Sequence, residues 1–245
     1  MSTLLRTVAA AADCFRISTR NSIAGNQVAS ALKQCRCAMS GHAARNPYLK
    51  DFRYKDTVEV KGGALRLAKE EHAMIDRFIR INQAGETAAV TIYKGQMAVL
   101  GRGDPELKAL LAHMLDQEVV HLETMDRHMA DFKVRPTVLQ PVAAAGGYVL
   151  GVVSALLGVR SAMTCTEAVE TKIGAHYNDQ LRDLHALQHA GLDDLKRSIA
   201  KCRDEELEHL DAAVDHGARM APLYRLQFEL IKGGCGVAIW LCARI

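Results

Sequence analysis

The pattern Asp-x-Glu-x-x-His occurs twice in this chain, as DQEVVH at residues 116–121 and as DEELEH at residues 204–209. Both copies fall in segments whose apolar residues recur every three to four positions, a spacing that predicts helices. Glu and His three positions apart point from the same face of a helix. In both copies that face is the apolar one, so the sequence directs ionisable side chains into the core. Few folds accept such an arrangement.

The same periodicity predicts four long helices and a final apolar helix, with no competing strand pattern, which makes the class all-α. Asp104 and Pro105 supply an N-cap and a first-turn proline for the second helix. The expected limits are Leu67–Leu100 for the first helix, Pro105 to about Phe132 for the second, a start near Ser161 for the third, and about Leu195 to His216 for the fourth, before the break at Ala221–Pro222.

The first and third helices each carry one glutamate on their apolar face, Glu86 and Glu170. Each is followed by a helix with Glu-x-x-His on its own apolar face. The link between the first two helices is short, so they should form an antiparallel hairpin. The chain is therefore expected to be a duplicated helical hairpin that folds into a four-helix bundle.

Four buried glutamates require compensation, because burying an unpaired carboxylate costs several kcal/mol. No lysine or arginine lies beside them on the apolar faces, so two divalent cations are expected. Four Glu and two His form the ligand set of di-iron and di-manganese bundles. Oxygen-rich ligation favours iron or manganese over structural zinc. The predicted ligands are Glu86, Glu118, His121, Glu170, Glu206 and His209.

Neighbouring polar residues are expected to lie outside this ligand set. Asp116 and Asp204 stand about 200° around the helix from their glutamates and should point away from the metals. Tyr177 could border the cavity or serve in packing. His113, His128 and His216 are expected as core or rim histidines, and Glu167, Glu205 and Glu208 as solvated side chains.

Residues 1–45 differ in composition from the rest, 46–245, which forms the predicted catalytic domain. Six basic residues against the single acid Asp13, with Ser and Ala enrichment, are typical of a mitochondrial transit peptide. Cleavage is expected between Arg36 and Pro47, and a disordered basic tail is the alternative. The other residues are nearly charge-balanced, which gives no nucleic-acid footprint. The cysteines show neither Cys-x-x-Cys spacing nor a disulfide framework.

Two apolar segments favour contact with a membrane. Residues 136–159 carry no charge, and the C-terminus reads GGCGVAIWLCARI. The first segment is just long enough to cross a bilayer, at about 1.5 Å per residue. Pro141 and several glycines interrupt it, so a helix or hairpin lying in the interface is favoured over a span.

The segments NQAGETAAVTIYKGQMAVLGR, DQEVVH, CTEAVETKIGAHYNDQ and RDEELEHLDAAVDH resemble the mitochondrial demethoxyubiquinone hydroxylases of coenzyme Q biosynthesis. The similarity runs from about Arg77 to the C-terminus. It implies a ferritin-like four-helix bundle with additional apolar membrane-associated helices. It also implies the six ligands named above, with Glu118 and Glu206 bridging the metals. Gln83 and Thr87 depart from the histidine and tyrosine that the family commonly has there.

The resemblance further implies an O2-dependent monooxygenase that hydroxylates demethoxyubiquinol at a centre of two iron ions, with NADH as electron donor. Such a protein works peripherally at the inner mitochondrial membrane, on the matrix side, with a lipid-binding partner protein and the wider biosynthetic complex. A homo-oligomer is compatible with the sequence. No glycine-rich phosphate loop for NADH is present.

Two other functions use part of the same pattern. A ferritin-like storage protein or ferroxidase could hold a similar ligand set, but polar outer faces would be expected of it. A metal-free membrane-scaffolding bundle would not explain the buried glutamates. Metal content separates the scaffold from the enzyme, and quinol turnover separates the storage protein.

Overall fold

The computed structural model describes residues 57–60 and 63–245, so the predicted transit peptide lies outside the described residues. The described part is almost entirely helical. Its elements are β1 (Thr57–Val60), β2 (Gly63–Arg66), α3 (Lys69–Leu100), α4 (Pro105–Phe132), α5 (Gln140–Leu156), α6 (Val159–Ala186), η2 (Ala190–Leu192), α7 (Asp193–Asp215), η3 (Ala218–Met220) and α8 (Tyr224–Cys242).

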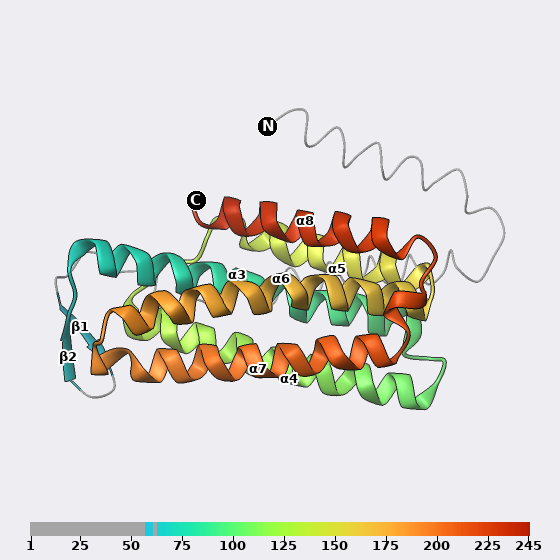
Figure 1. Cartoon of the computed structure of the whole chain (residues 1–245), viewed down its shortest axis with the longest axis horizontal. Coiled ribbons are helices and arrows are strands. Elements are labelled where there is room, and N and C mark those ends of the chain that lie inside the picture. Colours follow the sequence, from blue (N-terminus) through green and yellow to red (C-terminus); the bar gives the residue numbers. More distant parts are fainter. Residues whose placement is uncertain (1–56, 61–62) are drawn as a thin grey trace.

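The long helices form three layers of two (Figure 1). Helices α3 and α4 form one hairpin and α6 and α7 the other, and together they make the four-helix bundle. Helix α5 lies in the crossover between the hairpins and packs against α3, while α8 packs against α6. The predicted hairpin duplication is present in this arrangement.

The predicted helix limits agree with the observed ones to within a few residues. Asp104 caps α4 by accepting a hydrogen bond of 2.9 Å from the Glu106 amide, and Pro105 occupies the first turn. The antiparallel pair β1–β2 was not predicted. Its strands have four residues each, too few to produce a readable alternation.

Glycines set the distance between α5 and α3. A side chain at Gly151 would collide with the Ile92 carbonyl oxygen, and one at Gly147 with the Ala88 carbonyl oxygen. The absence of a Cβ at both positions lets the two backbones touch. Helix α5 is thereby held along α3. No helix of the described part is both long and apolar enough to cross a membrane.

Two apolar clusters fill the bundle and leave a polar layer between them. One contains Ile75, Ile79, Met125, Leu184 and Ile199. The other contains Leu107, Leu111, Met163, Ala162 and Ala213. Along each long helix, the predicted ligands fall between the residues of these two clusters, so apolar packing closes the site at both ends.

Candidate metal centre

The six predicted ligands meet in the centre of the bundle, where each is at most 2% exposed. Glu86 comes from α3, Glu170 from α6, and the two Glu-x-x-His pairs from α4 and α7. Their donor atoms fall into two overlapping groups, within each of which the atoms lie within 4.8 Å of one another. The first group is Glu86, Glu118, His121 and Glu206, and the second is Glu118, Glu170, Glu206 and His209.

Glu118 and Glu206 belong to both groups, and their oxygens are divided between the two histidines. For Glu118, Oε2 is 3.6 Å from His121 Nδ1 and Oε1 is 3.2 Å from His209 Nδ1. For Glu206, Oε1 is 3.3 Å from His121 Nδ1 and Oε2 is 3.1 Å from His209 Nδ1. Each carboxylate therefore spans the two halves, which is the position that a bridging ligand needs.

The residues fit a pair of divalent cations because several buried polar atoms of this layer have no hydrogen-bond partner. Among the described residues, these atoms include both carboxylate oxygens of Glu118 and Nδ1 of His121. A buried polar atom left in this way is costly. Oxygen-rich ligation with one imidazole in each half suits iron or manganese.

The protonation of the metal-free centre also favours a site for two divalent cations. Burial raises the pKa of Glu86 and of Glu170, and the neighbouring carboxylates raise both further. Burial by itself would lower the pKa of His209, but interactions with Glu118 and Glu206 raise it to about 9. The metal-free centre therefore retains protons at the places where divalent cations would put positive charge.

The outer nitrogen of each histidine is held by the opposite hairpin. His121 Nε2 lies 2.7 Å from Glu205 Oε2, and His209 Nε2 lies 3.0 Å from Gln117 Oε1. Such contacts orient ligand imidazoles. The prediction that Glu205 is solvated was wrong. The internal repeat could have indicated this role, because Gln117 and Glu205 both directly precede a ligand glutamate.

Two tyrosines hold the glutamates of α3 and α6. Tyr93 OH donates to Glu170 Oε1 at 3.1 Å, and Tyr177 OH donates to Glu86 Oε1. Both phenols are buried, and burial raises their pKa well above the ordinary value, as do the nearby carboxylates. Tyr177 therefore borders the site, and Tyr93 is its counterpart at the other outer glutamate.

The other polar residues mostly lie where the sequence predicted. Asp116, Asp204 and Glu208 are exposed. His128 is a core histidine 2.9 Å from Ser198 Oγ, and His216 contacts the Ala212 carbonyl on the rim. Glu167 corrects the prediction, because it is buried and accepts hydrogen bonds from Arg219 and Tyr224.

The two departures from the family pattern make contacts away from Glu86. Gln83 donates to Asp126 Oδ1 at 3.1 Å. Thr87 donates to the Gln83 carbonyl of its own helix at 2.8 Å. Neither of these hydrogen bonds reaches a predicted ligand, so the ligand layer is complete without the histidine and the tyrosine.

Comparison with known proteins identifies the family to which the chain is similar. The model of the family described as "Ubiquinone biosynthesis protein COQ7" matches residues 73–242. A Homo sapiens protein named NADPH-dependent 3-demethoxyubiquinone 3-hydroxylase, mitochondrial, is 43% identical over 78% of this chain and 87% of its own length. A Rhodospirillum rubrum 3-demethoxyubiquinol 3-hydroxylase is 47% identical over 71% and 79%. A Saccharomyces cerevisiae 5-demethoxyubiquinone hydroxylase, mitochondrial, is 43% identical over 73% and 82%.

Proposed function

The chain belongs to the ubiquinone biosynthesis protein COQ7 family, and from that premise we propose that it hydroxylates the ring of a demethoxyubiquinol in ubiquinone biosynthesis. The observation that carries the proposal is the position of Glu118 and Glu206. Each offers one oxygen to each half of a buried layer that also contains two further glutamates and two histidines. Such a layer would hold a pair of redox-active metal ions, as the same ligand set does in ferritin-like bundles.

Two iron ions, when bound, supply the activation of O2. Glu86 and His121 would hold one ion, Glu170 and His209 the other, and Glu118 and Glu206 would bridge them. The chain's own residues orient these ligands: Tyr177 and Tyr93 hold the outer glutamates, and Glu205 and Gln117 hold the histidines. The apolar clusters at both ends limit the access of water.

The electron donor is a pyridine nucleotide in this proposal. The resemblance implied NADH, whereas several relatives are named NADPH-dependent. An assay should therefore compare the rate of quinol hydroxylation with NADH and with NADPH, each in the presence of iron and O2. Equal rates would mean that the enzyme does not discriminate between the two nucleotides.

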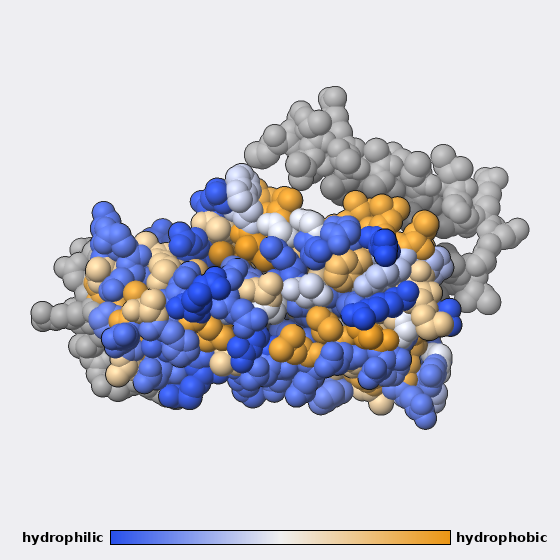
Figure 2. Space-filling model, in the orientation of Figure 1, coloured by the Kyte–Doolittle hydropathy of each residue, from blue (hydrophilic) through white to orange (hydrophobic). Residues whose placement is uncertain are grey.

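We propose that the protein lies at the surface of the inner mitochondrial membrane, on the matrix side. The exposed hydrophobic residues of helices α5 and α8 support contact with a lipid surface. Hydrophobic residues gather over α8 along the upper edge of Figure 2. The exposed ones on and beside these two helices include Val142, Val149, Val153, Leu156, Leu223, Leu226, Leu230, Val237 and Trp240. A long-tailed quinol is retained by the bilayer at roughly 0.8 kcal/mol per buried methylene, so the enzyme must meet it there.

The substrate's head group would enter from this apolar side, while its tail stays in lipid. A lipid-binding partner protein of the biosynthetic complex would meet the same side. The apolar surface favours this enzyme over a soluble iron-storage protein, which has no need of it. The buried carboxylate layer favours the enzyme over a metal-free scaffold.

The test is anaerobic reconstitution of the full chain with Fe(II), followed by addition of a demethoxyubiquinol analogue, reductant and O2. Two iron ions per chain and one hydroxylated product per turnover are expected, with ¹⁸O from ¹⁸O2 in the new hydroxyl group. Iron oxidation and retention without product would support the storage protein. Failure to bind iron would support the scaffold.

A further inference from the structure

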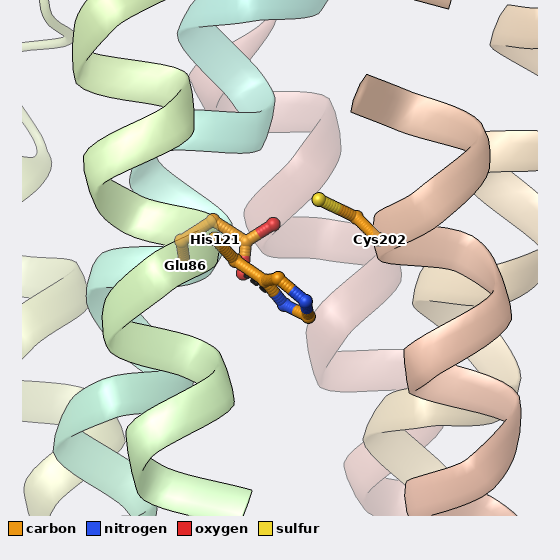
Figure 3. A group of neighbouring side chains, drawn as sticks. All are labelled: Glu86, His121 and Cys202. Atoms are coloured by element: carbon orange, nitrogen blue, oxygen red, sulfur yellow. Dashed lines mark ion pairs between the residues drawn. The ribbon is translucent and has the colours of Figure 1, made fainter. Parts of the chain in front are cut away.

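Cys202 lies on the inner face of α7, one turn before Glu206. Its side chain is 2% exposed. Its sulfur, a carboxylate oxygen of Glu86 and a ring nitrogen of His121 lie within 4.8 Å of one another. Figure 3 shows the three side chains converging from α7, α3 and α4. The thiol therefore borders one half of the metal centre.

Among the described residues, no thiol stands in the equivalent place in the other half. The internal repeat pairs Glu206 with Glu118, and the residue four positions before Glu118 is Met114, which packs in an apolar cluster with Leu111 and Met163. The group around Glu170 and His209 contains only carboxylates and one imidazole. The duplication thus supplies an internal comparison, in which the two halves differ by one thiol among the described residues.

A second observation points to a ligand at the same place. Nδ1 of His121 has no hydrogen-bond partner among the described residues, although the ring is 1% exposed and Nε2 is fixed by Glu205. This nitrogen lies 3.9 Å from Glu86 Oε2, a residue that also belongs to the group of Cys202. Glu206 Oε1 lies 3.3 Å from the same nitrogen, but Glu206 belongs to the carboxylate-rich group and not to the group of Cys202.

Sulfur, imidazole and carboxylate donors around one point suit Zn²⁺, which binds through three such protein ligands when water takes the fourth position. We propose that Cys202, His121 and Glu86 form a zinc-selective site in this half of the centre. The inference rests on the proposed function only in taking Glu86 and His121 as metal ligands. Binding replaces the S–H bond of Cys202 by a sulfur–metal bond, and the proton leaves to solvent.

Occupation by Zn²⁺ excludes Fe(II) from this half. Zn²⁺ has no redox chemistry, and it binds a given set of donors more tightly than Fe(II) does. Zinc would therefore be a tight inhibitor of iron loading, with a stoichiometry of one ion per chain. The oxygen-rich half, which lacks sulfur, would retain iron more readily.

The test uses Co²⁺ as a spectroscopic substitute for Zn²⁺, added to the metal-free full chain without O2, reductant or quinol. One equivalent should produce a near-ultraviolet thiolate-to-cobalt charge-transfer band. Cys202→Ser should abolish the band. The matched variant Cys165→Ser, which removes a buried thiol of α6 outside the ligand groups, should retain it. A serine triple variant of Cys14, Cys35 and Cys37 should also retain it.

Two further measurements distinguish loss of a ligand from partial misfolding of the Cys202→Ser variant. Competition with a chromophoric chelator gives the Kd for Zn²⁺, and circular dichroism gives the helix content. Loss of an outer partner of a ligand weakens binding by about 10–100-fold, so loss of a ligand should raise the Kd at least tenfold. A band that survives in Cys202→Ser, or a native chain without a band, would overturn the inference. Either result leaves the hydroxylation test untouched, because that test uses iron and quinol.

Discussion

Tyr93 on α3 donates a hydrogen bond of 3.1 Å to Oε1 of Glu170 on α6. Tyr177 on α6 makes the equivalent contact with Glu86 on α3. Each tyrosine stands seven residues after the glutamate of its own helix and holds the glutamate of the other. Neither hairpin completes the site alone, so correct docking of the two halves and correct ligand geometry are the same event.

The bridging glutamates should be indispensable. Glu118→Ala or Glu206→Ala removes the carboxylate that both halves share, and the centre then has too little negative charge for two cations. Iron content should fall well below two ions per chain, and hydroxylation should be lost. Glu208→Ala, on the exposed face of the same helix as Glu206, is the control and should change neither quantity. An essential Glu208 would contradict the helical register.

Glu205 should tune the metal through His121. Glu205→Gln retains the shape but removes the negative charge 2.7 Å from Nε2. Changes to such outer partners typically cost about 10–100-fold in metal affinity or activity. Iron dissociation, followed with a chelator, should therefore be faster in this variant. Glu208→Gln is the matched control, and equal dissociation rates in the two variants would contradict a positioning role for Glu205.

Removal of the Tyr93 hydroxyl should weaken both the fold and the site. Tyr93→Phe leaves a buried oxygen of Glu170 without its donor, at a cost of about 1–3 kcal/mol in the metal-free protein. Urea unfolding measures this loss. Iron affinity should fall as well, because Glu170 loses its orientation. Tyr224→Phe, which removes a hydrogen bond to Glu167 outside the ligand layer, should leave iron affinity unchanged.

Metal removal should make stability depend on pH. The pKa of His209 rises on folding to about 9 from an ordinary value near 6.5, so its contribution is complete below about 6.5 and is lost as pH rises through 9. The raised pKa values of Glu86 and Glu170 act in the same direction. The metal-free chain should therefore have a larger free energy of unfolding at pH 6 than at pH 9.

Metal should reverse this trend, because its ligands bind in their deprotonated forms. Urea unfolding of the metal-free and Fe(II)-loaded chains, at both pH values and without O2, measures both effects. Equal free energies of unfolding for the metal-free chain at pH 6 and pH 9 would contradict the protonation described above.

The exposed face of α8 should be needed for lipid binding. Leu226→Asp with Leu230→Asp places charges on side chains that are 55% and 66% exposed, so the core is spared. Binding to liposomes and turnover of a long-tailed quinol should fall, while iron content and turnover of a short-tailed analogue are retained. Leu207→Asp, an equivalent change on α7, is the control. Unchanged liposome binding in the α8 variant would contradict this surface assignment.

Leu150 and Ile239, by contrast, are poor positions for this test. Both are partly buried and pack against core residues, Leu150 in the cluster of Cys165 and Ile239 in that of Ile81. A charge at either position would disturb the fold together with the surface. The sequence could not show that Leu150 and Ile239 are partly buried, because both lie in segments without a charged residue.

Helical periodicity and the repeat were readable from the sequence because both are local. Spacing along one helix decides which face a residue occupies, so Glu86, Glu118, His121, Glu170, Glu206 and His209 could be selected before their helices were placed. Only the tertiary structure could decide what each face meets. Glu205 and Glu167 fall off the apolar stripes and were assigned to solvent, yet contacts from other elements bring them to His121 and Arg219. The position of Cys202 beside Glu86 likewise depends on how α7 is docked against α3 and α4, because distances between helices are set by packing across the bundle and leave no periodic trace in the chain.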